Sequence, residues 1–308
     1  MSQLTVKKQP EPNNLAYYWV GFIFLVLNKI RHSVRGYTSP RPFPITQVKR
    51  AIEYDFSVVN HWLEVLAEYT GNKADLRGKT ILELGPGADL GVGLITLWKG
   101  ARKYNAIDVH NLAESVPNQF YENLFHALEN NPAGDRVPVD YLRSQLKLTQ
   151  TGTNDKLNYI CRQDFDITIF GDEGIDLVFS QAAFEHFDDI DRAFSQLSKT
   201  VRHGAVLVAE IDLNTHTRWL RDVDPLNIYR YNDTIYNLFR FRGSPNRLRP
   251  FQYKETLEKY GWHDIRIIPL TRVEDKYLSA VTKRLNPRFL DQKNQVEFLS
   301  VMLCATKK

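Results

Sequence analysis

The sequence has few cysteines, and their positions argue against the common cysteine-based sites. Its 308 residues include only Cys161 and Cys304, which lie far apart and form no metal-ligand spacing. We therefore expect no zinc or iron–sulfur centre and predict no metal ion. So few cysteines are compatible with a reducing compartment, where disulfide bonds are rare, and we expect a cytoplasmic protein.

The sequence also lacks a strong excess of charge. The formal net charge is +4, and 43% of the residues are hydrophobic and 25% charged. This ordinary composition excludes wholesale disorder. Proteins that bind nucleic acid usually concentrate positive charge on one face, so the overall charge does not support that function. The length allows one large domain or two domains of roughly 150 residues each.

The apolar run Leu15–Leu27 has thirteen residues, fewer than the roughly 20 that a helix needs to span a bilayer. No small-residue cleavage pattern follows it, so a secretory signal is not supported. Three interpretations stay open: the run lies in a membrane interface, packs on protein as a lid or dimer contact, or spans the membrane. Its aromatic residues and the following Lys29, Arg31 and Arg35 suit peripheral contact with anionic lipid at the inner face of a membrane.

The stretch Thr80–Gly91 carries the clearest sign of a ligand site. An apolar run, interrupted by Glu83, ends at Gly85 and Gly87, which is typical of a buried parallel strand that turns into a helix. Glycines allow such a turn and let a ligand approach the main chain. The N-terminus of the next helix favours a negatively charged or polar group. A plain structural turn has the same features, so this stretch alone leaves both interpretations open.

Strands and helices alternate after this turn, which predicts parallel βαβ units in a doubly wound sheet with ligands at the carboxyl ends of the strands. Asp108 lies 21 positions after Gly87, the separation expected for a carboxylate that binds ribose hydroxyls; a helix cap or turn is the alternative. Asp164 follows the next strand and is expected at the same edge. The expected strands are 104–109, 158–162, 174–180 and 204–213. The expected helices are 51–69, 90–98, 118–128 and 190–200. We expect only the helix 118–128 in the stretch 111–155.

From about Lys79 to Leu213 the chain resembles the class I S-adenosylmethionine-dependent methyltransferases, in particular the type-11 group. The resemblance rests on four ordered landmarks: Glu83-Leu-Gly85-Pro-Gly87, Asp108, Asp164-Phe165, and Asp176-Leu-Val-Phe-Ser180 followed by Phe184-Glu185-His186. It implies an α/β fold with a doubly wound, Rossmann-like sheet of seven strands and an antiparallel C-terminal hairpin. It also implies S-adenosyl-L-methionine as the cofactor.

The resemblance assigns roles to the residues of these landmarks. It places Glu83, Gly85 and Gly87 along the methionine and ribose part of the cofactor, Asp108 on the ribose hydroxyls, Asp164 and Phe165 beside adenine, and Ser180 and Gln181 on the methyl-transfer side. The family often has another glycine two positions after Gly87, where this chain has Asp89. Asp89 could cap the following helix, but it leaves less room near the cofactor.

Two other functions remain as alternatives. An NAD(P)-dependent oxidoreductase fits less well, because the dinucleotide pattern G-x-G-x-x-G requires glycine at the position of Leu90. A membrane-associated protein that binds the cofactor without turnover is the second.

For a methyltransferase the sulfonium methyl group is electrophilic, so the enzyme must align the acceptor and remove a proton from a hydroxyl acceptor. His186 and His216, each just beyond a strand end, are the candidate bases.

Arginine and aromatic residues alternate in the stretch 214–250, which the resemblance makes an acceptor-side insertion. Arginine forks suit phosphate or carboxylate, so Arg218, Arg247 and Arg249 are candidates to bind an acidic acceptor. The same interleaving suits single-stranded nucleic acid, or the arginines pair with acids on a solvated helix. We expect O-methylation of a small molecule, lipid or glycan precursor and no nucleic-acid partner.

The expected organisation is an N-terminal tail, apolar helix and proline-rich linker over residues 1–44 and a methyltransferase domain over residues 45–308. The last part of that domain is expected to hold a helix at 252–260 and a hairpin of strands at 262–270 and 297–306, with room for another helix at 271–294.

Overall fold

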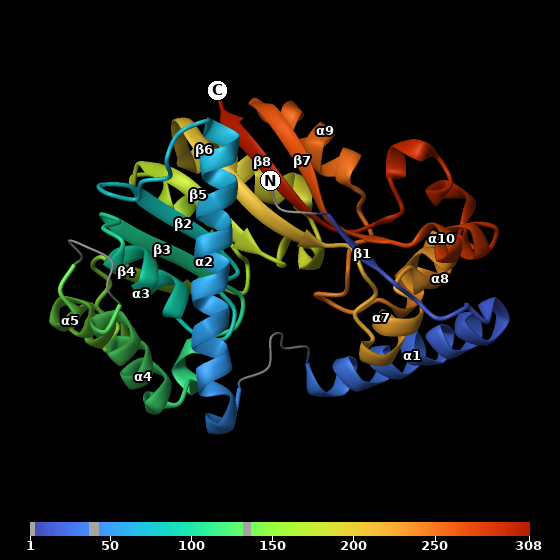
Figure 1. Cartoon of the computed structure of the whole chain (residues 1–308), viewed down its shortest axis with the longest axis horizontal. Coiled ribbons are helices and arrows are strands. Elements are labelled where there is room, and N and C mark those ends of the chain that lie inside the picture. The colour runs from blue at the N-terminus through green and yellow to red at the C-terminus, as the bar shows by residue number, and fades with distance from the viewer. Residues whose placement is uncertain (1–3, 37–42, 132–136) are drawn as a thin grey trace.

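A computed structural model describes residues 4–36, 43–131 and 137–308, with the side chains of Arg35 and Arg218 left out. One mixed sheet in the order β1-β7-β8-β6-β5-β2-β3-β4 runs through the molecule (Figure 1). The sequence predicts seven strands, and the sheet has eight. The additional strand is β1 (Thr5–Lys7), which pairs with β7 in parallel. It is three residues long and largely exposed, so it carries no apolar pattern that would reveal it.

The central strands form four neighbouring pairs, and all four pairs are parallel, as predicted. These strands are continuous apolar runs because helices cover both faces of a doubly wound sheet. Glu83 of β2 is registered between Ala106 of β3 and Phe179 of β5, so the glycine turn after β2 begins at the middle of the sheet. The central strands are β2 (Thr80–Leu84), β3 (Lys103–Asp108), β4 (Leu157–Cys161), β5 (Ile175–Gln181) and β6 (Val201–Asp212).

The expected C-terminal hairpin is present. Strands β7 (Trp262–Val273) and β8 (Phe298–Lys307) pair antiparallel, and β8 also pairs antiparallel with β6. The segment between β7 and β8 contains the helix α10 (Asp275–Thr282), which the length of that segment allowed.

Helices pack in two layers against the sheet, each with its own apolar core. One core joins the sheet to α2 (Val48–Thr70), α3 (Gly91–Trp98), α4 (Asn118–Glu129) and α5 (Val139–Gln150). The other joins it to α6 (Ile190–Thr200) and α9 (Pro250–Lys259). The expectation of one helix in residues 111–155 is wrong, since both α4 and α5 lie there. Only three residues of α5 are buried, which explains its weak apolar signal.

A third core lies in a cap, which we define as α1 (Asn14–Arg35), α7 (Arg218–Val223), η5 (Asn227–Arg230), α8 (Asp233–Phe239) and α10. The N-terminal helix packs on this cap: the Tyr18 and Tyr231 rings are 5.1 Å apart, and Tyr231 donates a hydrogen bond to the Tyr18 carbonyl at 2.8 Å. Of the three interpretations of the apolar run, packing on protein is therefore confirmed for one face of α1. No helix in the described ranges combines the length and apolar character that crossing a bilayer requires.

Candidate functional site

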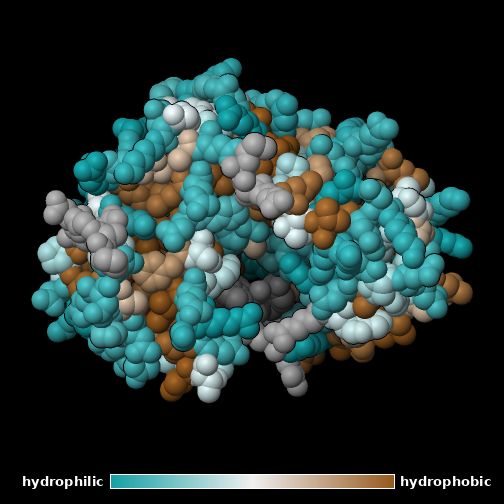
Figure 2. Space-filling model, viewed as in Figure 1, coloured by the Kyte–Doolittle hydropathy of each residue, from teal (hydrophilic) through white to brown (hydrophobic). Residues whose placement is uncertain are grey.

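A cleft of about 1040 Å³ lies at the carboxyl edge of the central strands. It is lined by the segments that follow β2, β3, β4, β5 and β6, by α2, by His32 of α1 and by the segment 241–243 after α8. Figure 2 shows the hollow at the centre of this face, between the α2 side and the α1 side. Small-molecule sites usually measure about 300–1,000 Å³, so this cleft can hold a cofactor together with an acceptor.

The glycine turn after β2 forms the floor of the cleft. Gly85 and Gly87 have φ angles of 75° and 83°, which other residues rarely adopt. A Cβ atom on Gly85 would also lie 2.8 Å from the Cβ of Ala183. Both glycines line the cleft, so the turn brings the main chain to the ligand, as the sequence predicts.

Glu83 lies behind this turn and is only 1% exposed. The Tyr104 hydroxyl donates a 2.5 Å hydrogen bond to its Oε2. Burial raises the pKa of Glu83 to about 8, although this hydrogen bond acts in the opposite direction. The side chain also lines the cleft, so a cationic group bound there would favour its ionised form.

Asp89 stands one residue before Leu90, the N-cap of α3, and its Oδ1 accepts a 2.8 Å hydrogen bond from the amide of Gly91, the first residue of that helix. It faces a second buried acid, Asp55 of α2, which sequence reasoning missed. Burial raises the pKa of Asp89 to about 6, and burial together with the charge of Asp89 raises that of Asp55. The available signal was an acid within the apolar stripe of α2, between Ile52 and Val58.

The predicted ribose ligand Asp108 stands at the end of β3, 6% exposed, and lines the cleft. Its Oδ1 accepts a 3.0 Å hydrogen bond from the His110 amide, and burial raises its pKa. Asp164 and Phe165 also line the cleft. The carboxylate of Asp164 is paired with Arg162 at 2.7 Å, which lowers the pKa of Asp164 to about 2.

The two residues predicted on the methyl-transfer side have different positions. Gln181 lines the cleft and donates a 2.8 Å hydrogen bond to Glu210. Ser180 is fully buried, and its hydroxyl donates a 2.9 Å hydrogen bond to the Leu84 carbonyl of the neighbouring strand. Because Ser180 does not line the cleft, we retain Gln181 and assign Ser180 to the support of the glycine turn.

The structure brings His186 and His216 together. Their ring centres are 4.7 Å apart, and both side chains line the same cleft as the glycine turn. Burial lowers the pKa of His186, and burial with the nearby His186 lowers that of His216 to about 4. Glu185 lies beside the two rings and is 2% exposed. Burial and the charge of Asp212 raise its pKa well above the ordinary value, although backbone amides act in the opposite direction.

The predicted substrate-binding arginines are not in the cleft. Arg249 is fully buried and donates hydrogen bonds to the Tyr229 hydroxyl and to three carbonyl oxygens. Arg247 is 3% exposed and contacts Asp233 at 2.5 Å. The side chain of Arg218 lies outside the described residues. We therefore remove Arg247 and Arg249 from the substrate site, because their guanidinium groups hold the cap and the last hairpin together.

Other arginines stand at the cleft itself, namely Arg50, Arg192 and Arg242. The interpretation that insertion arginines pair with acids is confirmed for Arg247 and for Arg230, which forms a 2.8 Å ion pair with Asp224. The Arg230 pair is buried rather than solvated, since both side chains are 0% exposed.

Comparison with known proteins identifies one family model. Residues 122–209 match the model described as "Methyltransferase domain", which is less than a third of the 308 residues. The match confirms the resemblance to methyltransferases and S-adenosyl-L-methionine as the cofactor. The bounds 45–308 of the domain stay a prediction. No curated protein matches the chain significantly.

Many solved structures are similar at low sequence identity. The Haemonchus contortus phosphoethanolamine N-methyltransferase 2, solved with S-adenosyl-L-methionine, is 14% identical with a TM-score of 0.46, and the match covers 80% of this chain and 52% of that one. The CurJ carbon methyltransferase is 15% identical with a TM-score of 0.45, covering 95% of this chain and 67% of that one. The cyclase SpnF is 14% identical with a TM-score of 0.43, covering 99% of both. This chain spans about half the length of the first.

Proposed function

We propose that this chain, with its methyltransferase domain, transfers the methyl group of S-adenosyl-L-methionine to an oxygen of a small molecule, lipid or glycan precursor. The observation that carries the proposal is the shared cleft. Glu83, Gly85, Gly87 and Asp108 line it together with His186 and His216. The cofactor residues and the two imidazoles therefore face one volume.

The mechanism we propose has two parts. The walls of the cleft hold the acceptor in line with the sulfonium methyl group, which removes much of the entropic barrier of a bimolecular step. His186 or His216 takes the hydroxyl proton as the acceptor oxygen attacks the methyl carbon and the sulfonium becomes a thioether. Burial keeps both imidazoles neutral at pH 7, because it lowers the pKa of each, and a neutral imidazole can accept a proton.

The test uses S-adenosyl-L-methionine with a deuterated methyl group and fractionated polar and lipid extracts. We expect a product labelled on oxygen, formed together with S-adenosylhomocysteine. Labelled products on nitrogen or carbon would refute O-methylation. Consumption of no cofactor in any fraction, despite measured cofactor binding, would favour the alternative of a binding protein without turnover.

A lipid surface is the acceptor environment that we propose, and helix α1 is the reason. Its face away from the cap carries exposed apolar side chains at spacings of three and four residues, which form one stripe along the helix: Leu15, Trp19, Ile23, Leu27, Ile30 and Val34. Brown residues gather along the edge of the molecule where α1 lies (Figure 2). The helix has no acidic residue and three basic ones, which suits the interface of an anionic membrane.

Vesicle flotation tests this surface. We expect the full-length protein to float with vesicles that contain phosphatidylserine and to float less with pure phosphatidylcholine. The triple variant Trp19→Ser, Ile23→Ser, Leu27→Ser should lose flotation, whereas Leu238→Ser, an exposed leucine outside the stripe that is 66% accessible, should retain it. Equal flotation of both variants would refute the surface, and so would self-association of the wild type through the stripe without vesicle binding.

A further inference from the structure

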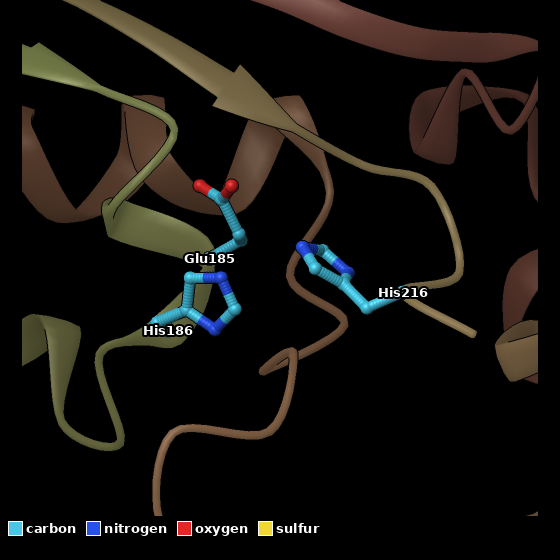
Figure 3. A group of neighbouring side chains, drawn as sticks. All are labelled: Glu185, His186 and His216. Carbon is cyan, nitrogen blue, oxygen red and sulfur yellow. The ribbon is translucent and has the colours of Figure 1, made fainter. Parts of the chain in front are cut away.

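Three potential metal ligands converge on one wall of the cleft. Glu185 and His186 belong to η4 (Phe184–His186), which follows β5, and His216 lies in the segment after β6. One ligand atom from each of the three residues lies within 4.8 Å of the others. Figure 3 shows His216 opposite the pair, with one ring nitrogen turned toward them. The two segments meet because β5 and β6 are neighbours in the sheet.

Among the described residues, the protein fold supplies no cation that would compensate the burial of the Glu185 carboxylate. Glu185 is 2% exposed, and no described side chain donates a hydrogen bond to either of its oxygens; the backbone amides of Glu185 and Asp212 act to lower its pKa, which nevertheless stays well above the ordinary value. A buried carboxylate without a cationic partner is costly. It would be stabilised by a cation beside it, and both imidazoles reach that position.

The hydrogen bonds of the two histidines orient them for a cation. Nδ1 of His186 lies 2.6 Å from the Gly243 carbonyl, and Nδ1 of His216 lies 3.1 Å from the Asn214 carbonyl. A carbonyl can only accept, so these contacts assign the proton to Nδ1 and leave the lone pair on Nε2 of each ring. Metal-binding histidines usually donate their second ring N–H to a carbonyl or carboxylate in this way.

We propose that Glu185, His186 and His216 bind one divalent transition-metal ion, such as Zn²⁺ or Mn²⁺. Two imidazoles and one carboxylate suit these ions, whereas Mg²⁺ and Ca²⁺ prefer sites made of oxygen atoms. With bonds of about 2.0–2.2 Å, neighbouring ligand atoms around a tetrahedral or octahedral ion lie about 3–3.6 Å apart. The present separation of up to 4.8 Å therefore has to close by about 1–2 Å when the ion binds.

Asp212 lies beside this group but is not counted as a ligand. Its Oδ2 is 2.6 Å from Arg221 Nη1, and its Oδ1 accepts hydrogen bonds from the amide and side chain of Asn214. The same Oδ2 is 3.9 Å from Nε2 of His216. Asp212 therefore adds negative charge near the proposed ion while its oxygens stay occupied.

The site departs from the expectation of no metal ion, which rested on cysteine spacing alone. Its role in catalysis rests on the proposed function: a hydroxyl acceptor that binds the ion would lose its proton more easily, because a divalent cation lowers the pKa of oxygen ligands. In that case the two imidazoles hold the ion, and the proton passes to solvent or to another base.

Calorimetric titration of the full-length, chelator-treated protein with ZnCl₂, MnCl₂ and MgCl₂ tests the site without any acceptor. We expect about one equivalent of Zn²⁺ or Mn²⁺ to bind and Mg²⁺ to bind much more weakly. Glu185→Gln and His216→Ala should each weaken binding by at least about tenfold. His203→Ala removes an exposed histidine from β6 and should bind as the wild type does.

Co²⁺ absorption of the wild-type protein provides a second measurement, which needs no variant to fold. We expect bands of histidine-bound Co²⁺ that disappear when Zn²⁺ is added. Absence of these bands, or equal Zn²⁺ affinity in the wild type and both ligand variants, would refute the site. Cofactor binding by the same samples distinguishes this failure from failure of the proposed function, because a metal-free methyltransferase would still bind S-adenosyl-L-methionine.

Discussion

Replacement of Asp108 by alanine should weaken cofactor binding with little change in the fold. The side chain stands at the open end of β3, and its Oδ1 is occupied by the His110 amide at 3.0 Å. The backbone amides of Val109 and Gly87 also act on this carboxylate, which is 6% exposed and lines the cleft where the ribose hydroxyls would bind. Loss of hydrogen bonds to a buried charged acceptor costs about 1–3 kcal/mol, which corresponds to an increase in Kd of about 5- to 150-fold.

Calorimetry with S-adenosylhomocysteine measures this change, and the matched control is Asp75→Ala. Asp75 does not line the cleft, and its carboxylate is 47% exposed and paired with Arg77 at 2.6 Å. An exposed ion pair is worth little, so we expect the Kd of this variant to change by less than about threefold. An unchanged Kd for Asp108→Ala in a folded protein would refute the ribose assignment, and equal losses in both variants would refute the distinction between the two acids.

Three other predictions concern stability. Burial raises the pKa of Glu83 from 4.5 to about 8 in the folded protein, so its contribution to stability is complete below about pH 4.5 and is lost progressively as the pH rises to about 8. Thermal unfolding of the cofactor-free protein should therefore show a smaller decrease in Tm over that pH range for Glu83→Gln than for the wild type. Gly91→Ala would place a Cβ atom 2.0 Å from Oδ2 of Asp55, so we expect it to lower the free energy of unfolding by about 1–3 kcal/mol in urea. A variant as stable as the wild type would show that α2 shifts freely to make room. Arg249→Met leaves several buried acceptors unpaired and should cost at least about 3 kcal/mol in the same assay, whereas Arg242→Ala, at the exposed cleft, should cost less than about 1 kcal/mol.

Most elements could be predicted because their signals are local. Strand β2 and the glycine turn follow from a short apolar run and two glycines, and the φ angles of Gly85 and Gly87 explain why those residues stand there. The position of Asp108 at the end of β3 follows from chain order in a parallel sheet. The helix α5 and the strand β1 were missed, because an exposed element has little apolar pattern.

The positions of the arginine side chains depend on contacts between residues that are far apart in the sequence. Arg249 donates to the Asn294 carbonyl, 45 positions away, and no local pattern indicates that such a guanidinium group points into the fold. Sequence reasoning assigned Arg247 and Arg249 to the substrate from residue type alone. The structure places them in the core of the cap and puts other arginines at the cleft.

The sequence by itself determined the order of strands and helices, the glycine turn and the acid after the second central strand, because these depend on neighbours a few residues apart. Only the tertiary structure decided which side chains share the cleft. Asp55 meets Asp89, and Glu185 and His186 meet His216, because strand order and helix packing bring together segments that are far apart in the chain. The chemistry of the site depends on these contacts between distant segments.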